Sequence, residues 1–421
     1  MKNPELLCLG CMEELECPGD TCRKCGFNRE EYERNRNVRT LPSYTILVGK
    51  YLLGRVLGEG GFGITYIAWD LNRECRVAIK EYFPVGLATR DTRGREGESL
   101  TVMPGEQAAY YRNGLRNFAE EGKNLARFHE LSGIVSVRDF FQDNETAYIV
   151  MDYVEGMNLK QYLTNYYAHS GEHAPMNEKQ VLRMMQPVLD SLIEVHKTGV
   201  IHRDISPENI ICGRDGRITL IDFGAARVAT GNETRSLTIM LKHGYAPPEQ
   251  YQSHGRQGAW TDIYAICATM YHMMSGYLPT ESIDRVFDDS LPALEAVNPQ
   301  ISKTVSDIIK KGMSVRIEDR YQTVEEMCQL LYPKETMEKE KEEPKYADPN
   351  ASVKEEVDNK EEENVYTSEK TREEKIIYSG NPATDRELEE QENVIVRPKM
   401  GPLEIGSVVI LVLIFVGSFL V

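Results

Sequence analysis

The chain has 421 residues, of which 66 are acidic and 49 are basic, so its formal charge at pH 7 is −17. This length has room for two or three folding units. The acidic balance argues against a general nucleic-acid-binding protein, which needs a basic surface to displace the counterions of the phosphate backbone. The charge is uneven, because residues 333–393 alone hold 20 acidic and 10 basic side chains.

Five of the nine cysteines lie within the first 25 residues. Four of them form two C-x2-C pairs, which are Cys8 with Cys11 and Cys22 with Cys25. Such pairs predict a zinc-ribbon-like module over residues 1–28, in which four thiolates close a tetrahedral structural Zn²⁺ site. Cys17 is an alternative ligand in place of Cys22. A closed site predicts a structural or partner-binding role, and a redox switch is the alternative.

A charged connector over residues 29–43 leads to a segment of mixed globular composition, residues 44–332, which suits one large two-lobed unit or two tightly docked domains. Strands are expected at 51–69 (two strands around a Gly-rich turn), 75–80 and 146–151. Helical periodicity is found at 107–128, 178–197, 262–275 and 305–311. The predicted fold class is therefore α+β, with a β-rich first lobe and an α-rich second lobe.

The link between the third strand and the first long helix is longer than a minimal connection. Residues 90–95 and 99–103 can form a hairpin within it. A regulatory or docking insert and a tolerated surface excursion are both open interpretations.

The last part of the chain changes character twice. Residues 333–400 are rich in Glu and Lys with few large apolar side chains, which predicts a disordered acidic linker. Residues 405–421 carry no charge and would span about 25 Å as a helix, close to a hydrocarbon core of ~30 Å. We predict a transmembrane helix over 403–421. Arg397 and Lys399 precede it, and the positive-inside rule then places the two-lobed unit in the cytoplasm.

Gly58, Gly60 and Gly63 fit the spacing G-x-G-x-x-G. A dinucleotide-binding turn has the same spacing but opens a helix, whereas residues 64–69 here continue as a strand. A Gly-rich hairpin lets backbone N–H groups approach phosphates closely. Lys80, at the end of the next apolar strand, is a candidate phosphate ligand.

Two carboxylates and a carboxamide follow in the second half of the segment, at Asp204, Asn209 and Asp222. Oxygen ligands of this kind suit Mg²⁺, which prefers a few carboxylates together with substrate phosphates. Asp204 is a candidate acceptor for the proton of an attacking hydroxyl.

In this order the motifs resemble those of the eukaryotic-type (Hanks-type) protein kinases. They are the Gly-rich loop, V-A-I-K ending at Lys80, H-R-D followed by Asn209, D-F-G from Asp222, and Pro247-Pro248-Glu249 where kinases carry A-P-E. The resemblance covers about residues 51–332. The residues that follow Lys80 and Pro248 are similar to those of bacterial serine/threonine kinases. It implies transfer of the γ-phosphoryl group of MgATP to protein hydroxyls, in membrane-associated signalling.

The resemblance also implies roles for single residues. Lys80 would hold the α- and β-phosphates and pair with a helix carboxylate, for which Glu121 is expected and Glu120 is the neighbouring alternative. Asp204 would be the catalytic base, and Asn209 and Asp222 would hold Mg²⁺. The remaining expectations are Met151 as gatekeeper, 152–154 as the adenine hinge, Glu249 paired with Arg320, and Asp262 as an anchor of the catalytic loop.

Two positions depart from the family pattern. Serine/threonine kinases carry a lysine two residues after the catalytic aspartate, where this chain has Ser206. They carry threonine in the loop before A-P-E, where alignment on Tyr245 places Lys242. Because these two side chains lie together in the family, we predict that Lys242 supplies the missing cation as a catalytic residue. The alternative is a solvated loop lysine in a slower enzyme.

The resemblance implies protein substrates. The uncharged C-terminal run predicts a membrane contact through residues 403–421, and the acidic charge balance argues against nucleic acid as a partner. Tethering favours self-association that permits phosphorylation in trans. Hydroxyls available for regulatory phosphorylation, with Arg203 as the expected phosphate partner, are those of Thr230, Thr234, Ser236 and Thr238. A constitutively active enzyme is the alternative.

The rival function is a pseudokinase scaffold that organises partners through the kinase fold and the zinc ribbon, and Ser206 is the feature that favours it. A small-molecule kinase on the same fold is disfavoured, because Pro247-Pro248-Glu249 and the preceding loop are typical of a protein-substrate platform.

Overall fold

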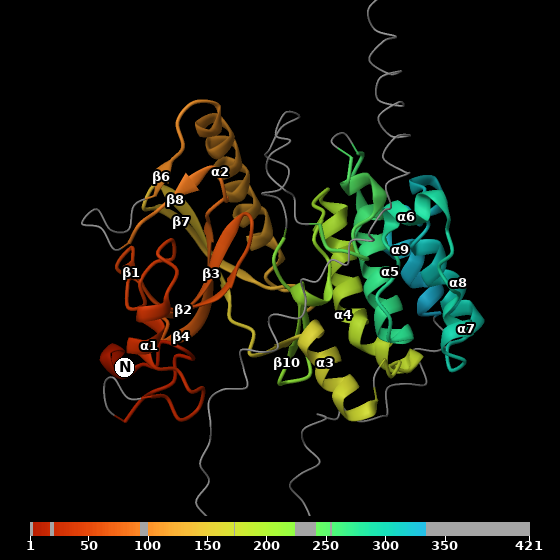
Figure 1. Ribbon diagram of the computed structural model, residues 1–421, viewed down its shortest axis with the longest axis horizontal. Helices are drawn as coiled ribbons and strands as arrows, with labels where there is room; N and C mark the ends of the chain where they lie inside the picture. The colour runs from red at the N-terminus through yellow and green to blue at the C-terminus, as the bar shows by residue number, and fades with distance from the viewer. Residues whose placement is uncertain are drawn as a thin grey trace, which may run out of the picture. The chain divides into compact units, whose positions relative to one another are not determined.

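The computed structural model describes residues 3–16, 21–92, 100–171, 173–223, 241–252 and 255–333. The chain divides into two units, Met1–Glu355 and Glu356–Val421, and all described residues belong to the first. They form a β-rich lobe and a helical lobe (Figure 1). The predicted transmembrane helix and, apart from Pro333, the predicted linker lie outside the described residues. Among the residues described, none of the helices is long and apolar enough to cross a membrane.

The first lobe is built on a six-stranded antiparallel sheet in the order β1-β2-β3-β4-β8-β7. The strands are β1 (Ile46–Leu47), β2 (Tyr51–Glu59), β3 (Gly63–Asp70), β4 (Cys75–Tyr82), β7 (Val137–Asp143) and β8 (Thr146–Asp152). The strands expected at 51–69, 75–80 and 146–151 are confirmed. Strand β8, which lies between β4 and β7, is buried along all but its last residue, so the sheet is covered on both faces at this strand.

Helix α2 (Glu106–Leu125) packs on β7 and β8, as Figure 1 shows. Tyr111, Phe118 and Leu125 are buried seven residues apart, on one face of the helix. Two glycines on this helix allow its close approach, because a Cβ at Gly114 would clash with Tyr82 and one at Gly122 would press on Ile149. The helix predicted at 107–128 is confirmed, and its last three residues form a 3₁₀ turn.

The helical lobe surrounds α5 (Ala259–Ser275), in which every residue of 261–275 except His272 is buried. The other helices are α3 (Leu159–Ser170), α4 (Glu178–Lys197), α6 (Ser282–Phe287), α7 (Leu294–Val297), α8 (Lys303–Gly312) and α9 (Val324–Leu331). The helices predicted at 178–197, 262–275 and 305–311 are confirmed. A small sheet of β9 (Gly156–Asn158), β10 (Ile210–Gly213) and β11 (Ile218–Leu220) lies where this lobe meets the first.

The N-terminal module is docked on the first lobe. Its apolar residues Leu7, Leu9 and Met12 form one buried cluster with side chains of β2 and β3, namely Leu52, Ile67 and Trp69. The Arg55 backbone N–H donates to the Leu9 carbonyl at 2.7 Å, and a Cβ on Gly54 would clash with that same carbonyl. The sequence motifs alone do not predict this packing, because the cysteine spacing reports on metal ligands and not on neighbouring surfaces.

The segment expected to be a charged connector contains helix α1 (Arg29–Asn35), which is capped by the Asn28 side chain. The Tyr32 hydroxyl accepts a hydrogen bond from the Val56 backbone N–H at 2.9 Å. Beyond the helix, Asn37 donates to the Glu59 carboxylate at 3.0 Å, within the Gly-rich hairpin. The connector is therefore part of the first lobe.

The insert after β4 is anchored in the core. Its hairpin pairs β5 (Ala88–Thr89) with β6 (Thr101–Val102), so the first strand lies earlier than predicted. Next to it Arg90, only 3% exposed, forms a bidentate ion pair with the fully buried Glu81. The Tyr66 and Tyr148 hydroxyls also donate to Glu81, at 3.0 and 2.7 Å. Buried charges need this many partners, so the interpretation as a mere surface excursion is wrong for Ala88 and Arg90, which are both buried.

Candidate functional site

A buried carboxylate in α5 fixes the loop that carries Asp204. Asp262 is fully buried and accepts the backbone N–H groups of His202 and Arg203 at 2.7 and 2.8 Å. His196 of α4 adds a third bond at 2.8 Å. Burial by itself raises the pKa of Asp262, but these donors outweigh it and the pKa is lowered. The prediction that Asp262 anchors the loop is confirmed.

His202 connects this loop to the strand before Asp222. Its Nδ1 accepts the Asp204 backbone N–H at 3.2 Å, and its Nε2 lies 3.0 Å from the Ile221 carbonyl. Burial lowers the pKa of His202 to about 4. The ring is therefore neutral at pH 7, and these two partners assign the proton to Nε2.

The structure brings Asp204, Asn209 and Asp222 together. The Asn209 amide donates to the backbone carbonyl of Asp204 at 2.7 Å and to its carboxylate at 2.9 Å. The Ile221 backbone N–H donates to the Asn209 carbonyl at 2.8 Å, which places the neighbouring Asp222 beside Asn209. Arg203 and Asp222 both have a φ of 68°, a left-handed conformation that costs a non-glycine residue energy and is concentrated at functional sites.

Lys80 of β4 reaches this group from the other lobe. Its ammonium donates to the Asp222 carboxylate. Burial alone lowers the pKa of Lys80, but the charges of Asp222 and Glu121 reverse that effect, so the lysine is protonated. Lys80 and Asp222 thus form an ion pair across the junction of the two lobes.

Glu121 and Glu120 of α2 are placed differently. Glu121 is buried near Lys80, whereas Glu120 is exposed and pairs with Lys123. Burial raises the pKa of Glu121 to about 8, even though the nearby Lys80 lowers it. A hydrogen-bonded Lys80–Glu121 pair is not formed in this structure, because the Lys80 ammonium contacts Asp222 instead.

The three glycines of the hairpin differ in what they permit. Gly58 has open space where a Cβ would lie, and Gly60 has only one atom near, at 3.9 Å. A Cβ on Gly63 would instead clash with the Glu81 carbonyl of β4. Gly58 and Gly60 therefore leave a bare backbone for a ligand to approach, while Gly63 is required by strand packing.

Met151 lies in a small apolar cluster at the lobe junction. It packs with Ala78 and Val135, and side chains around them are those of Leu57, Tyr153, Val154 and Ile221. The prediction named Met151 and the hinge at 152–154 but missed Leu57, Ala78 and Ile221. Their only signal is apolar character at strand positions, which most core residues share.

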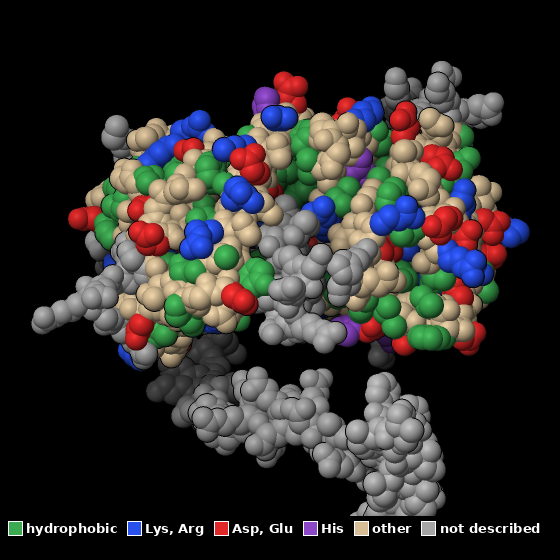
Figure 2. Space-filling view, turned by 90° about the horizontal axis from the view of Figure 1, so that it is seen from above, with side chains coloured by type: hydrophobic (Ala, Val, Ile, Leu, Met, Phe, Trp, Pro, Cys, Tyr) green, Lys and Arg blue, Asp and Glu red, His purple; other side chains and the backbone are tan. Residues whose placement is uncertain are grey.

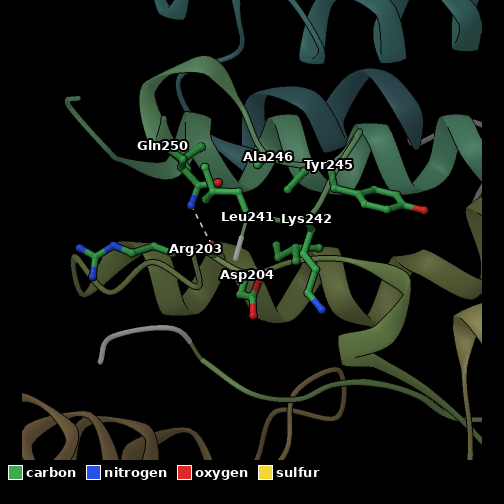
Figure 3. A pocket seen from close by; sticks show the side chains of 10 residues that line it. Arg203, Asp204, Leu241, Lys242, Tyr245, Ala246 and Gln250 are labelled. Atoms are coloured by element: carbon green, nitrogen blue, oxygen red, sulfur yellow. Dashed lines mark hydrogen bonds between the residues drawn. The ribbon is translucent and has the colours of Figure 1, made fainter. Parts of the chain in front are cut away.

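A pocket beside Asp204 is lined by the loop that carries Asp204 and by the segment on either side of Pro247. Its lining includes Asp204, Lys242 and Gln250. Figure 3 shows the side chains of Asp204 and Lys242 extending to the same side, with Arg203 turned away from them. The Gln250 amide donates to the Arg203 carbonyl at 2.8 Å, which ties the two segments together (Figure 3).

Lys242 donates to the Glu208 carboxylate, and Glu208 also accepts from Lys160 of α3 at 2.8 Å. Ser206 is buried, and its hydroxyl has no hydrogen-bond partner within the described part of the chain. Sequence reasoning did not assign Glu208 a role, although it directly precedes Asn209.

The predicted ion pair below the pocket is confirmed. Arg320 donates to both oxygens of Glu249 at 2.7 and 2.9 Å, and both residues are buried. The Thr261 hydroxyl adds a bond to Glu249 at 3.0 Å. The hydroxyls predicted as phosphorylation sites, which are Thr230, Thr234, Ser236 and Thr238, lie outside the described residues.

The four predicted zinc ligands form a second site, on the N-terminal module. All Sγ atoms of Cys8, Cys11, Cys22 and Cys25 lie within 4.8 Å of one another. Cys8 and Cys25 are 3.6 Å apart, and Cys11 and Cys22 are 3.8 Å apart. A tetrahedron with Zn–S bonds of about 2.3 Å has edges of about 3.8 Å, so the arrangement fits a Zn²⁺ ion. Cys17, the alternative ligand, lies outside the described residues.

On the face seen in Figure 2, basic and acidic side chains are interspersed over the described surface of both lobes. Among the described residues, this face has no extended basic area of the kind that binding to a phosphate backbone requires.

Comparison with known families identifies the two-lobed segment. The model of the protein kinase domain family matches residues 51–332, about two thirds of the sequence. The match contains the Gly-rich hairpin, Lys80 and the Asp204 loop, but not the cysteine module.

Two bacterial relatives illustrate the similarity. The serine/threonine-protein kinase PrkC of Bacillus subtilis is 28% identical over 286 residues, which are 66% of this chain and 39% of PrkC. Serine/threonine-protein kinase F of Synechocystis is 28% identical over 296 residues, which are 68% of this chain and 55% of that protein. The match thus covers about half or less of these relatives.

Solved structures agree on the fold. PpkA-294 in its apo form is 34% identical, with a TM-score of 0.59, over 70% of this chain and 99% of that one. The PknI kinase domain of Mycobacterium tuberculosis is 22% identical with a TM-score of 0.50, over 69% of this chain and 98% of that one. At that identity the second likeness concerns the fold alone.

Proposed function

Because this chain belongs to the protein kinase family, we propose that it is a bacterial serine/threonine kinase that transfers the γ-phosphoryl group of MgATP to protein hydroxyls. The observation that carries the proposal is the convergence of Lys80, Asp204, Asn209 and Asp222 at the lobe junction. Each has the chemistry that the reaction needs, and they come from three separate segments: strand β4, the loop that holds Asp204 and Asn209, and the segment after β11. A scaffold has no requirement for this combination.

In the proposed reaction, a substrate hydroxyl loses its proton to the Asp204 carboxylate while its oxygen forms a bond to the γ-phosphorus. The bond from that phosphorus to the β,γ-bridging oxygen breaks, and ADP leaves with the electron pair. The Asn209 amide holds the Asp204 carboxylate in place. Asn209 and Asp222 would hold Mg²⁺, whose charge offsets that of the phosphates.

Nucleotide binding requires Lys80 to change partners. In the free protein its ammonium is bound to Asp222. We infer that the Lys80 ammonium leaves Asp222 and binds the α- and β-phosphates. Buried Glu121 then becomes its carboxylate partner, as the family resemblance implies. The purine base would rest on the apolar cluster around Met151, beside the backbone of 152–154.

The proposal predicts that full-length protein incubated with Mg²⁺ and ATP incorporates phosphate into serine or threonine side chains. Asp204→Asn should abolish incorporation, because the amide cannot accept the proton, while a fluorescent nucleotide still binds with nearly unchanged affinity. Mass spectrometry would map the sites. If wild type bound nucleotide normally but transferred no phosphate to itself or to a general protein substrate, the pseudokinase scaffold would be the better account.

We also propose that Lys242 supplies the cation that Ser206 cannot. Lys242 and Asp204 line one pocket, and their side chains extend to the same side in Figure 3. A fixed ammonium beside the transferring group stabilises the charge that develops in the transition state. Its hydrogen bond to Glu208 leaves the ammonium at the edge of the pocket, from which a flexible lysine side chain reaches a phosphoryl group.

Lys242→Ala is therefore expected to lower kcat by at least about tenfold with little change in the KM for ATP, since the cation acts mainly in the transition state. The exchange Ser206→Lys with Lys242→Thr should recover part of the loss. Steady-state kinetics on full-length variants measure both. An alanine variant with the turnover of wild type would identify Lys242 as an ordinary loop residue.

We propose further that the four-cysteine cluster binds one structural Zn²⁺. Its support is the tetrahedral spacing of the four sulfur atoms and their place in a module with apolar contacts to β2 and β3. Four protein ligands leave no open position for catalysis, so the ion would hold the shape of the docked surface.

Metal analysis of reduced full-length protein should find one zinc per chain. Cys8→Ser should lose the zinc and lower the thermal midpoint by about 4 °C or more, because Leu7, Leu9 and Met12 then lose their packing on the sheet. Cys75→Ser, which changes a cysteine outside the cluster, is the matched control. It should keep the bound zinc and the thermal midpoint of the wild type. Protein without stoichiometric zinc would refute the metal site.

Finally, we propose that residues 403–421 anchor the protein in the bacterial cell membrane as a single pass, with the kinase in the cytoplasm. The support is the uncharged run of 405–421 and the basic residues Arg397 and Lys399 before it. A tether on a long linker raises the effective concentration of neighbouring copies and so favours phosphorylation in trans.

A further inference from the structure

Glu208 occupies an unusual place in the catalytic loop. It lies on the 3₁₀ turn Pro207–Asn209, between two residues that are buried, but its own side chain is 37% exposed. The carboxylate is therefore presented at the rim of the site while its backbone is held by the same turn that positions Asn209.

Two lysines from separate elements bind this carboxylate. Lys160 approaches from the first turn of α3 with a side chain that is 67% exposed, and Lys242 approaches from the segment before Pro247 with a side chain that is 32% exposed. Exposed ion pairs are screened by solvent and contribute little, whereas partly shielded pairs are screened less, so their geometry is held more firmly. The Lys242 contact is thus the more consequential of the two.

The backbone of Lys242 is also fixed. Its carbonyl accepts the N–H groups of Tyr245 and Ala246, both at 3.0 Å. With the backbone held, the position of the ammonium depends on the four rotatable bonds of the side chain, which is costly to order without a partner. Glu208 provides that partner, and the Lys242 side chain that it binds extends to the same side as Asp204.

We propose that Glu208 is a positioning residue that holds the Lys242 ammonium beside Asp204 for phosphoryl transfer. This inference rests on the role proposed for Lys242. It gives the exchanged lysine a dedicated partner on the catalytic loop, at a site where the lysine of other serine/threonine kinases would belong to the loop itself.

The test compares kcat, both KM values and thermal stability for full-length Glu208→Gln, Lys242→Ala and the double variant. Glu208→Gln keeps the size of the side chain but removes its charge. We expect kcat to fall roughly three- to tenfold, with the KM for ATP and the thermal midpoint unchanged. The double variant should be no slower than Lys242→Ala alone, because the two residues act as one unit. Glu208→Asp should restore part of the rate.

Lys160→Met is the matched control, since it removes the other lysine from the same carboxylate, and it should change kcat by less than about twofold. A Glu208→Gln variant with wild-type kcat overturns the proposal. So does a loss that simply multiplies with that of Lys242→Ala, or one confined to the KM of the protein substrate, which would make Glu208 a substrate-binding residue. If Lys242→Ala itself has no effect, the lysine exchange fails, whereas an effect of Lys242→Ala without one of Glu208→Gln refutes only the positioning role.

Discussion

The Asp262 carboxylate, fully buried in α5, accepts the backbone N–H groups of His202 and Arg203 and so sets the conformation of the loop that ends at Asn209. A buried charge is stable only when its partners are complete, and Asp262 has donors from two backbone groups and one imidazole. Because the two backbone donors belong to the loop itself, the loop cannot shift without taking two of the three donors away from the buried charge. The hydrogen bonds to Asp262 therefore also fix the positions of Asp204 and Asn209 on the loop.

Strand β4 contacts the second lobe through one of its residues and the core of the first lobe through the next. Successive residues of a strand point to opposite faces, so Lys80 extends toward Asp222 while Glu81 extends into the buried network with Arg90. Arg90 in turn donates to the Arg39 carbonyl in the connector, at 3.1 Å. The strand that carries Lys80 is therefore held by contacts with the insert and the connector on the side of Glu81, which makes both segments parts of the first lobe.

Much of this arrangement could be predicted from the sequence. The strands and helices with clear periodicity, the loop anchor at Asp262 and the Glu249–Arg320 pair were expected and are present, because regular motifs fix local geometry. The docking of Leu9 on Gly54, the burial of Arg90 and the partner of Lys242 were not expected. Each depends on which surfaces meet in space, and a charged residue such as Arg90 carries no local signal that it will be buried. The Lys80–Asp222 pair was also unforeseen, since the resemblance describes the nucleotide-bound arrangement.

The central claim is that the lobe junction is an MgATP site in which Lys80 leaves Asp222 for phosphate. The most direct measurement is a crystal structure of the full-length protein, solubilised in detergent, with Mg²⁺ and a non-hydrolysable ATP analogue bound. The account predicts Mg²⁺ on Asn209 and Asp222, Lys80 bound to the phosphates and to Glu121, and the Lys242 ammonium within hydrogen-bond reach of the γ-phosphate. An analogue bound elsewhere, or one bound while Lys80 stays on Asp222, would contradict it.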